Sequence, residues 1–297
     1  MFTMMNNARL AVGMQGVAVA EAATQKSIAY ANERRQGKAS DYFGAGMAPI
    51  VHHPDVQRNL LTMKALTQIA RAISYSCAHA IDMARASSGD RAAHWRDRAN
   101  LLTPLAKAFS TDVGVEVASL GVQVHGGMGF IEETGAAAYY RDARIAPIYE
   151  GTNGIQAIDL VTRKLPLGGG EHVHGYIDEL AGIANAVRTS TLDGFGRAAD
   201  ALDQALSELT QATRFLLKLS AEGRTEEALA GATPYLRLIS LAAGGAYLAR
   251  AALADQGRIA LCRFFAENLL GEASALKGRV IDGAGSLAAA AEALISA

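Results

Sequence analysis

The stretch Arg141-Asp-Ala-Arg-Ile-Ala-Pro-Ile-Tyr-Glu-Gly-Thr-Asn-Gly-Ile-Gln156 sets one carboxylate, Glu150, in a glycine-containing turn. An apolar approach (145–149) precedes this turn, and an amphipathic helical pattern (151–165) follows it. A carboxylate aimed by a turn beside apolar residues is partly desolvated, and desolvation raises a carboxyl pKa toward the range useful for proton abstraction. Glu150 is therefore a candidate general base. Spacing alone favours a plainer interpretation, in which Glu150 only stabilises the dipole of the helix that follows.

The sequence on both sides of this turn predicts helices. Half of the 297 residues are hydrophobic, only six are proline, and alternation of β-branched residues is scarce. Such a composition supplies a sizeable core and favours helices over sheets. Long helices joined by short loops predict an up-down bundle. The helices expected before the Glu150 turn span 7–33, 54–86, 95–123 and 133–140.

The clearest linker in the chain follows the helix predicted at 151–165. It consists of Pro166 and the run Gly168–Gly170. We therefore predict an all-α protein of two domains, an up-down helix bundle over residues 1–165 and a second helical domain over 166–297. The helices expected after the linker are Ala- and Leu-rich and span 172–189, 194–221, 224–232, 234–254 and 256–292, the last with a break near Gly271 or Gly283.

Charge and cysteine usage exclude several classes of function. A net charge of −1 argues against a broad nucleic-acid footprint. Cys77 and Cys262 lie in apolar helical patterns, which indicates buried thiols in a reducing compartment rather than a disulfide or a catalytic thiol. The histidine pairs at 52–53 and at 172 and 174 have no further ligand nearby, so no metal site is predicted.

No apolar run reaches the length of a membrane span. The stretch after Arg9 superficially resembles a signal peptide. Gly13, Gln15 and Gly16 interrupt it, and its helical periodicity continues toward Tyr30. We interpret this stretch as a core helix, and we expect a cytoplasmic protein without a membrane segment.

Three further features allow both a functional and a plain interpretation. Gly126-Gly127-x-Gly129 lacks a preceding strand, so it is not a dinucleotide-binding fingerprint. Its missing Cβ atoms could let a ligand approach the backbone, or could simply end a helix. Arg34 could bind a phosphate, or could be a solvated cation in the last turn of a helix. Thr152 could cap the helix after Glu150 or lie beside a cofactor oxygen at the helix N-terminus.

Five motifs occur in order along the chain: Tyr30-Ala-x-x-Arg34-x-Gln-Gly-Lys38, His53-Pro-Asp-Val56, Gln123-x-x-Gly-Gly-x-Gly-Phe130, Arg141-Asp-x-Arg-Ile145 and Ile148-Tyr-Glu-Gly-Thr-Asn153. In their order and spacing they resemble the acyl-CoA dehydrogenases over about residues 1–165. The helices after Pro166 resemble the additional C-terminal domain of a larger bacterial subfamily, which includes 3-methylmercaptopropionyl-CoA dehydrogenase-like enzymes.

The resemblance implies a flavin mechanism and places its base. Members of the family remove a proton from the α-carbon of an acyl-CoA thioester while a hydride leaves the β-carbon for FAD. Glu150 matches their catalytic base, and its backbone N–H is expected to help polarise the thioester carbonyl. Tyr149 and Gly151 flank this base and are expected at the substrate. Asn6 and Arg9 match residues near the CoA and thioester end.

The same resemblance assigns the cofactor contacts. Arg34 matches an arginine that reaches the FAD pyrophosphate of a neighbouring subunit. Gln123, Gly126 and Gly127 match a segment that contacts the adenosine part across the same interface, and Thr152 matches a threonine in contact with the flavin. We therefore expect a homo-oligomer, a dimer or a tetramer, with acyl-CoA as substrate and an electron-transfer flavoprotein as electron acceptor.

The sequence departs from the family pattern at several places. Asn6 stands where many members have Asp, and Gly154 stands where the family often has Gln or Glu, so one polar contact to FAD is expected to be missing. Gly37 follows Gln36 directly, without the Phe that many members place between them. The chain also begins eight residues before Arg9, whereas the family carries an N-terminal helical domain and a small β-domain before the bundle. We therefore expect the C-terminal half of such an enzyme, as a truncated chain, a split gene product or a fragment.

A non-catalytic alternative stays open. The chain could be a helical module that oligomerises, or that complements a partner chain carrying the missing domains. This alternative predicts a well-folded helical oligomer without flavin, and with exposed apolar surface where the β-domain would dock. A nucleic-acid-binding relative of the same fold is disfavoured by the charge balance.

Overall fold

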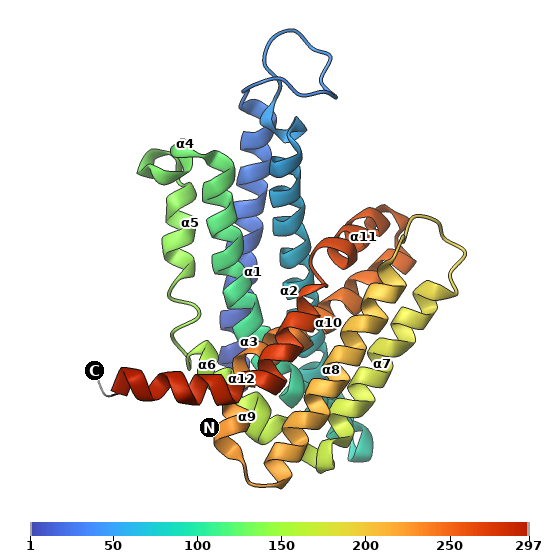
Figure 1. Cartoon of the computed structure of the whole chain (residues 1–297). Coiled ribbons are helices and arrows are strands. Elements are labelled where there is room, and N and C mark those ends of the chain that lie inside the picture. Colours follow the sequence, from blue (N-terminus) through green and yellow to red (C-terminus); the bar gives the residue numbers. More distant parts are fainter. Residues whose placement is uncertain (1, 296–297) are drawn as a thin grey trace.

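Three long helices form the first half of the molecule. The structure is a computed structural model that describes residues 2–295, with side-chain environments from residue 6 onward. Helices α1, α2 and α3 pack side by side along most of their length (Figure 1). Shorter helices follow α3 and return along it. The bounds are α1 Phe2–Glu33, η1 Ile50–His52, α2 Pro54–Ala86, α3 Gly89–His125, α4 Gly127–Phe130, η2 Glu132–Thr134, α5 Ala136–Ala143, α6 Asn153–Asp159 and η3 Leu160–Lys164.

Two glycines let α1 approach α3 more closely than side chains would permit. A Cβ atom at Gly13 would lie 2.2 Å from the carbonyl oxygen of Ala106, and one at Gly16 would lie 2.3 Å from that of Ser110. Gly114 faces Gly16 from the opposite side of this contact. The two backbones are therefore in direct contact beside Lys107, which becomes important for the site described below.

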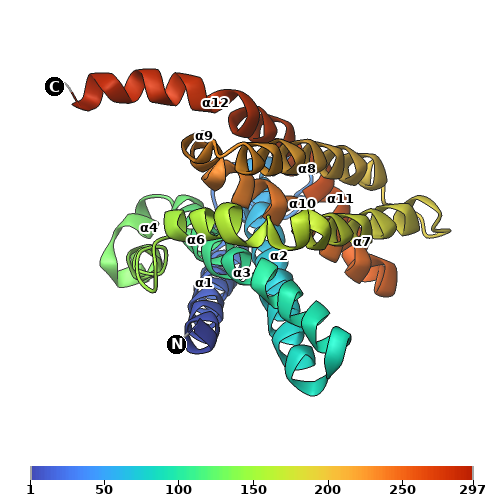
Figure 2. The ribbon, with the colours of Figure 1, turned by 90° about the horizontal axis from the view of Figure 1, so that it is seen from below.

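The second half packs around one apolar helix, α10. This helix lies between α2 and the helices α7, α8 and α11 (Figures 1 and 2). Gly244 of α10 is in contact with Ile69 of α2, because a Cβ there would come within 2.7 Å of the isoleucine Cβ. The bounds are η4 Leu167–Gly170, α7 Glu171–Arg188, α8 Ala198–Ala221, α9 Thr225–Ala230, α10 Ala232–Ala254, η5 Gln256–Arg258, α11 Ile259–Asn268 and α12 Glu272–Ile295.

Helix α10 is the one helix among residues 2–295 that is long and apolar enough to cross a membrane. Most of its apolar stretch, 78%, is buried inside the protein. A core helix satisfies the same length and composition test. Its position at the centre of the second half accounts for its apolar composition.

The all-α prediction is confirmed, and the differences lie at helix ends. Within the described residues no strand occurs, and Arg35 and Pro49 form an isolated bridge. The helix predicted over residues 256–292 is interrupted between α11 and α12, at Gly271, and α12 continues without a break through Gly283. The linker glycines 168–170 all have positive φ and make a tight turn. The buried residues of both halves form one continuous core, so a division at residue 165 stays a prediction.

Candidate active site

The turn that carries Glu150 is closed by one backbone hydrogen bond. The N–H of Asn153 donates to the carbonyl oxygen of Pro147 at 3.0 Å, which leaves residues 148–152 as its tip. Glu150 has a φ of 55° and Gly151 a φ of 85°. Glu150 is the single non-glycine residue with positive φ within residues 2–295. Such a conformation costs about 1–3 kcal/mol and persists only where the surroundings impose it, which is typical of functional sites.

A buried lysine of α3 binds the turn from the side that faces the protein interior. Lys107 of α3 has no exposed surface, and its Nζ donates to the carbonyl oxygen of Gly151 and to Oδ1 of Asn153, both at 2.8 Å. Burial lowers the pKa of Lys107 to about 8, and the nearby cation of Arg9 acts in the same direction. The carboxylates of Asp112 and Glu150 oppose that shift. The lysine therefore keeps most of its charge at neutral pH, directly under the strained backbone.

Asn153 joins the turn to α3 through the other half of its amide. Its Nδ2 donates to the carbonyl oxygen of Ala108 at 3.0 Å and to a carboxylate oxygen of Asp112 at 2.7 Å. Thr111 completes the contact, with its hydroxyl 3.2 Å from Oδ1 of Asn153. A single side chain at the start of α6 thus fixes where the Glu150 turn lies on the bundle.

The pH dependence of stability is expected to reveal Lys107. Its pKa in the fold, about 8, lies below the ordinary 10.5, so the unfolded chain binds more protons between these two values. Stability from this group therefore rises with pH across that window. Lys107→Met removes this rise and leaves the Gly151 carbonyl without its donor, a loss of about 1–3 kcal/mol. Urea unfolding should show the difference between wild type and Lys107→Met widening from about pH 7.5 to about pH 10.

Lys64→Met is the matched control for this experiment, because Lys64 is exposed on α2. We expect its stability to follow the wild type over the same pH range. A constant difference between Lys107→Met and wild type at all pH values would contradict the assignment.

The Glu150 side chain differs from the prediction in one respect. It is exposed within this chain, so the partial desolvation expected from its apolar neighbours in the sequence is wrong for the chain by itself. The neighbouring isoleucines explain the difference, since they are between 38% and 56% exposed and do not cover the carboxylate. These isoleucines are Ile145, Ile148, Ile155 and Ile158.

The backbone of the turn presents free donors. Among the residues that the structure describes, no acceptor is found for the N–H groups of Glu150 and Gly151. Tyr149 is half-buried beside them, and its hydroxyl donates to the side-chain carbonyl of Gln15 on α1. The arrangement places one carboxylate and two unpaired N–H groups on the same exposed tip, which suits a substrate that carries a polarised carbonyl.

Thr152 caps α6, as the plainer interpretation predicted. Its hydroxyl accepts from the N–H of Ile155 at 3.4 Å, and its own backbone is extended. The side chain is exposed, so this cap leaves the hydroxyl accessible to a ligand. A contact between Thr152 and a flavin stays a prediction.

Arg9 lies inside the protein. Its guanidinium Nη1 donates to Oδ2 of Asp159 at 3.1 Å, and the two side chains are only 9% and 2% exposed. The exposed side chain of Arg163 binds the other oxygen of Asp159. Arg9 thus joins α1 to the end of α6, and this pairing accounts for its burial. Asn6, one turn earlier on α1, is half-buried.

The predicted cofactor residues other than Thr152 form a second group at the C-terminal end of α1. Arg34 directly follows the end of α1, and Tyr30, one turn earlier, stacks on His125 at the end of α3 with ring centroids 4.3 Å apart. Gly126 and Gly127 come next in the chain after His125. The Glu150 turn contacts α1 at Gln15, through Tyr149, whereas Arg34 follows the last residue of this helix. At the rise of an α-helix these two places on α1 are about 27 Å apart.

This second group fits the phosphate and adenosine part of a dinucleotide. Arg34 is exposed, and within the described residues its guanidinium has no side-chain partner. Space around Gly126 and Gly127 is open, so a ligand can approach their peptide groups, and Gln123 is exposed one turn before them. The arrangement offers one cation and bare backbone, which are the groups that recognise a pyrophosphate.

The two adjacent glycines are expected to respond differently to alanine. Gly126 has φ 60° and ψ −140°, a conformation that only glycine adopts easily, whereas Gly127 has an ordinary helical φ and open space at its Cβ. Gly126→Ala should lower the free energy of unfolding by about 1–3 kcal/mol. Gly127→Ala should be neutral or stabilising by up to about 1 kcal/mol. Thermal unfolding of the two variants checks this, and equal losses would show that the helix end is assigned wrongly.

The sequence did not reveal Lys107, Asp159 or Gln156. Lys107 gave one usable signal, since it is a lone charge in the run from Leu101 to Thr111, which is buried on all sides. Gln156 is fully buried under the turn, and neither atom of its amide has a partner. The two cysteines behave as predicted, because both are free and buried, and burial raises the pKa of the Cys77 thiol to about 11.

Comparison with known proteins relates this geometry to one family. A family model described as acyl-CoA dehydrogenase, C-terminal domain, matches residues 1–165, and one described as acetyl-CoA dehydrogenase C-terminal like matches residues 176–291. The 3-methylmercaptopropionyl-CoA dehydrogenase of Ruegeria pomeroyi is 41% identical over 97% of this chain and 51% of its own length. A butyryl-CoA dehydrogenase of Syntrophomonas wolfei is 34% identical over 62% of this chain and 31% of its own length.

Solved structures share the fold. An acyl-CoA dehydrogenase from Bacillus anthracis, solved with FAD, gives a TM-score of 0.72 at 20% identity and covers 95% of this chain and 50% of its own. Caenorhabditis elegans ACDH-11, solved with C11-CoA, gives 0.71 at 21% identity, with 90% and 43% covered. The chain spans about half the length or less of the curated relatives it matches. The chain belongs to the acyl-CoA dehydrogenase family, of which it covers the C-terminal helical portions.

Proposed function

We propose that this chain supplies the proton-abstracting half of an enzyme that oxidises an acyl-CoA thioester to the 2-enoyl-CoA. The observation that carries the proposal is the strained backbone of Glu150. A glutamate at positive φ is less stable than a glycine at the same position. Lys107 and Asn153 hold this strain in place from the buried side. A structural role would be filled better by glycine, so the carboxylate itself is the reason for the strain.

The tip of the turn can bind and deprotonate a thioester. The unpaired N–H of Glu150 would donate a hydrogen bond to the thioester carbonyl oxygen, and the carboxylate of Glu150 would remove the α-proton. The exposed isoleucines 145, 148, 155 and 158 offer apolar surface on either side of the turn. A flavin bound beside this turn would take up the hydride that leaves the β-carbon. Covering the isoleucines with the segments that complete the relatives would supply the desolvation that this chain lacks.

Two flavin sites explain why the predicted residues fall into two groups. Thr152 would contact the flavin beside Glu150 of its own subunit. Arg34, Gln123, Gly126 and Gly127 would reach the pyrophosphate and adenosine of FAD in a neighbouring subunit. The distance of about 27 Å between the groups along α1 supports this division. A site shared with a neighbouring subunit in turn requires at least a dimer.

Substrate and partners follow from the same proposal. The names of two relatives give 3-methylmercaptopropionyl-CoA and butyryl-CoA, so short acyl-CoA thioesters are the first candidates. We further propose an electron-transfer flavoprotein as acceptor and a cytoplasmic location. The alternative is a helical module that completes a partner chain without chemistry of its own, and the exposed isoleucines beside Glu150 favour it equally.

Flavin retention, and its dependence on Arg34, test the proposed cofactor site. The chain is co-expressed with the N-terminal half of the Ruegeria pomeroyi relative, incubated with FAD and desalted, and its visible absorbance is recorded. We expect a retained flavin band and a dimer or tetramer by light scattering. Arg34→Gln should weaken FAD binding by about tenfold or more, the effect of losing one charge-assisted hydrogen bond. Arg91→Gln, an exposed arginine at the start of α3, is the control. A monomer without flavin would contradict the proposal.

A further inference from the structure

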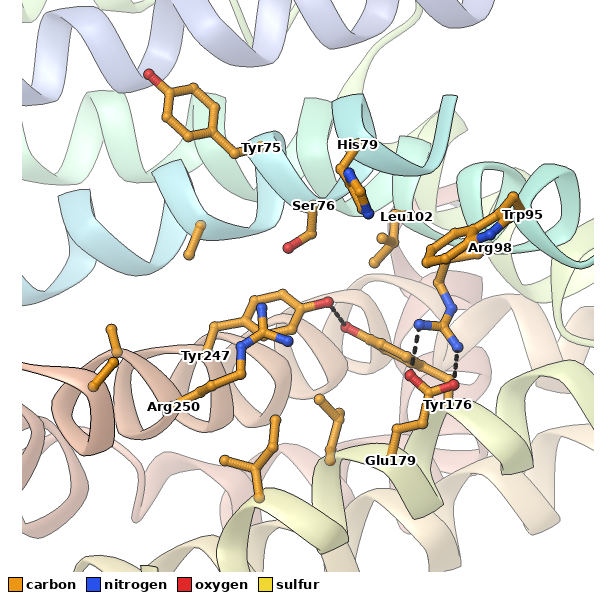
Figure 3. Close-up of a pocket in the computed structure, with 15 residues that line it drawn as sticks. Tyr75, Ser76, His79, Trp95, Arg98, Leu102, Tyr176, Glu179, Tyr247 and Arg250 are labelled. Atoms are coloured by element: carbon orange, nitrogen blue, oxygen red, sulfur yellow. Dashed lines mark hydrogen bonds and ion pairs between the residues drawn. The ribbon is translucent and has the colours of Figure 1, made fainter. Parts of the chain in front are cut away.

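A cavity of about 710 Å³ lies between the two halves of the molecule, away from the Glu150 turn. Helices α2 and α3 form one side, and α7 and α10 form the other (Figure 3). None of its lining residues belongs to either group of predicted site residues. The volume lies within the usual range for small-molecule sites, about 300–1,000 Å³.

The wall of this cavity is mainly apolar and aromatic. Leu102, Leu180 and Ile183 line its interior, and Trp95 stands against His79 in an edge-on contact with ring centroids 5.3 Å apart. This composition would hold an apolar ligand body by burying it from water.

One wall carries two tyrosines whose hydroxyl groups meet. The hydroxyls of Tyr176 and Tyr247 are 2.8 Å apart, and Tyr176 is fully buried. Burial raises the pKa of Tyr176 well above its usual range, so this phenol keeps its proton. In a pair of phenols only one O–H can donate to the other, and no second acceptor for the pair occurs in the described part of the chain. One O–H donor is therefore left over at the cavity.

The charges around the cavity leave one cation unpaired. Arg98 is bound through both of its terminal nitrogens by Glu179, and these two charges cancel. Arg250 lies over the ring of Tyr247, with its guanidinium carbon 5.1 Å from the ring centroid. Arg250 is exposed, and among the side chains that the structure describes no hydrogen bond or ion pair joins it to another side chain.

Two further polar groups point into the same space. Figure 3 shows Ser76 and His79 of α2 directed into the cavity, opposite Tyr247 and Arg250 of α10. No hydrogen bond is recorded for the side chain of either Ser76 or His79 among the described residues. A helical serine usually bonds to the backbone of the preceding turn, so a free serine hydroxyl here is available to a ligand.

We propose that this cavity binds a small monocarboxylic acid with an apolar body, its carboxylate on Arg250 and its body against Trp95 and Ile183, which are half-buried. A single unpaired guanidinium matches a single negative charge and pairs with a carboxylate through two hydrogen bonds. Phosphate groups carry more charge and are usually met by several free cations or a helix N-terminus; here Arg98 is already paired with Glu179, which leaves Arg250 alone, and no helix N-terminus lies in the lining. The site is independent of the Glu150 turn and would be a second binding site on the protein.

Tryptophan fluorescence can report binding at this site. Trp95 is the one tryptophan of the chain and lines the cavity. Its fluorescence is recorded while the purified chain is titrated with octanoate, and in parallel with 1-octanol, which has the same apolar body without the charge. We expect a saturable change with octanoate and binding at least about tenfold weaker for 1-octanol, the effect of one charge-assisted contact.

Three variants test the assignment. Arg250→Gln should weaken octanoate binding at least about tenfold, whereas Arg214→Gln, an exposed arginine on α8, should leave it unchanged. Ser76→Phe should fill the cavity and abolish saturable binding while thermal unfolding stays close to the wild type. The proposal is overturned by any of three results: no saturable change in the wild type, equal binding of octanoate and 1-octanol, or wild-type affinity in Arg250→Gln.

Discussion

Glu150→Gln is expected to lower kcat for acyl-CoA oxidation by about 10²–10⁴-fold, the usual contribution of a general base. The amide has nearly the same shape as the carboxylate but cannot take up a proton. Binding of the thioester through the backbone N–H groups should be preserved, so KM should change little. The assay uses the chain co-expressed with the N-terminal half of the Ruegeria pomeroyi relative, butyryl-CoA or 3-methylmercaptopropionyl-CoA, and an artificial electron acceptor.

Two companion variants make this result specific. Glu226→Gln, an exposed glutamate on α9, should leave kcat unchanged. Glu150→Gly should abolish activity without loss of stability, and should raise the free energy of unfolding by up to about 1 kcal/mol, because glycine relieves the strain of a positive φ. A Glu150 that only stabilised the dipole of α6 would behave in the opposite way. Glu150→Gln and Glu150→Gly would then both lower the free energy of unfolding while activity remained.

Arg9→Met is expected to lower the free energy of unfolding by about 3 kcal/mol, near the lower end for breaking a buried ion pair. The variant leaves the buried carboxylate of Asp159 with only Arg163, whose side chain is 53% exposed. Arg163→Gln should lose less than about 1 kcal/mol, because the Arg163 side chain is solvated and Asp159 keeps its buried partner Arg9. Urea unfolding of both variants measures the two losses, and nearly equal losses would show that the buried pair has no special role.

The same variant separates two roles for Arg9. The resemblance to the family assigns it to the substrate, whereas the structure gives it an internal partner, Asp159. An internal role predicts a fall in stability with KM close to the wild type at a temperature where the variant stays folded. A substrate role predicts a rise in KM of about tenfold or more with little change in stability.

Helical periodicity and glycine positions were enough to predict the fold. The apolar stripes of α1, α2 and α3 predicted three long helices, and the stop at Gly126 is where α3 ends. The early start of α3 was missed because its first residues are polar, although Ser88 stands at the N-cap position and Asp90 lies in the first turn. Helix α1 begins at Phe2, earlier than the predicted start at residue 7. The break at Gly271 and the continuation at Gly283 could not be told apart, since glycine is tolerated in a helix that packs on only one side.

The site was predictable only in part. Glu150 and its neighbours were found from local sequence, but the positive φ that gives them meaning is a property of the folded backbone. Lys107 lies off the apolar stripe of α3 and is buried because neighbouring helices cover α3 on all sides. Arg9 and Asp159 are 150 residues apart in the chain, and no spacing rule predicts a contact over that distance.

The central claim is that Glu150 removes the α-proton of an acyl-CoA, and exchange of that proton for deuterium tests it most directly. The co-expressed protein is incubated with butyryl-CoA in D₂O, and deuterium at the α-carbon is followed by mass spectrometry. We predict incorporation with the wild type and with Glu226→Gln, and none above the buffer rate with Glu150→Gln. Equal incorporation in wild type and Glu150→Gln would contradict the account, because another group would then be the base.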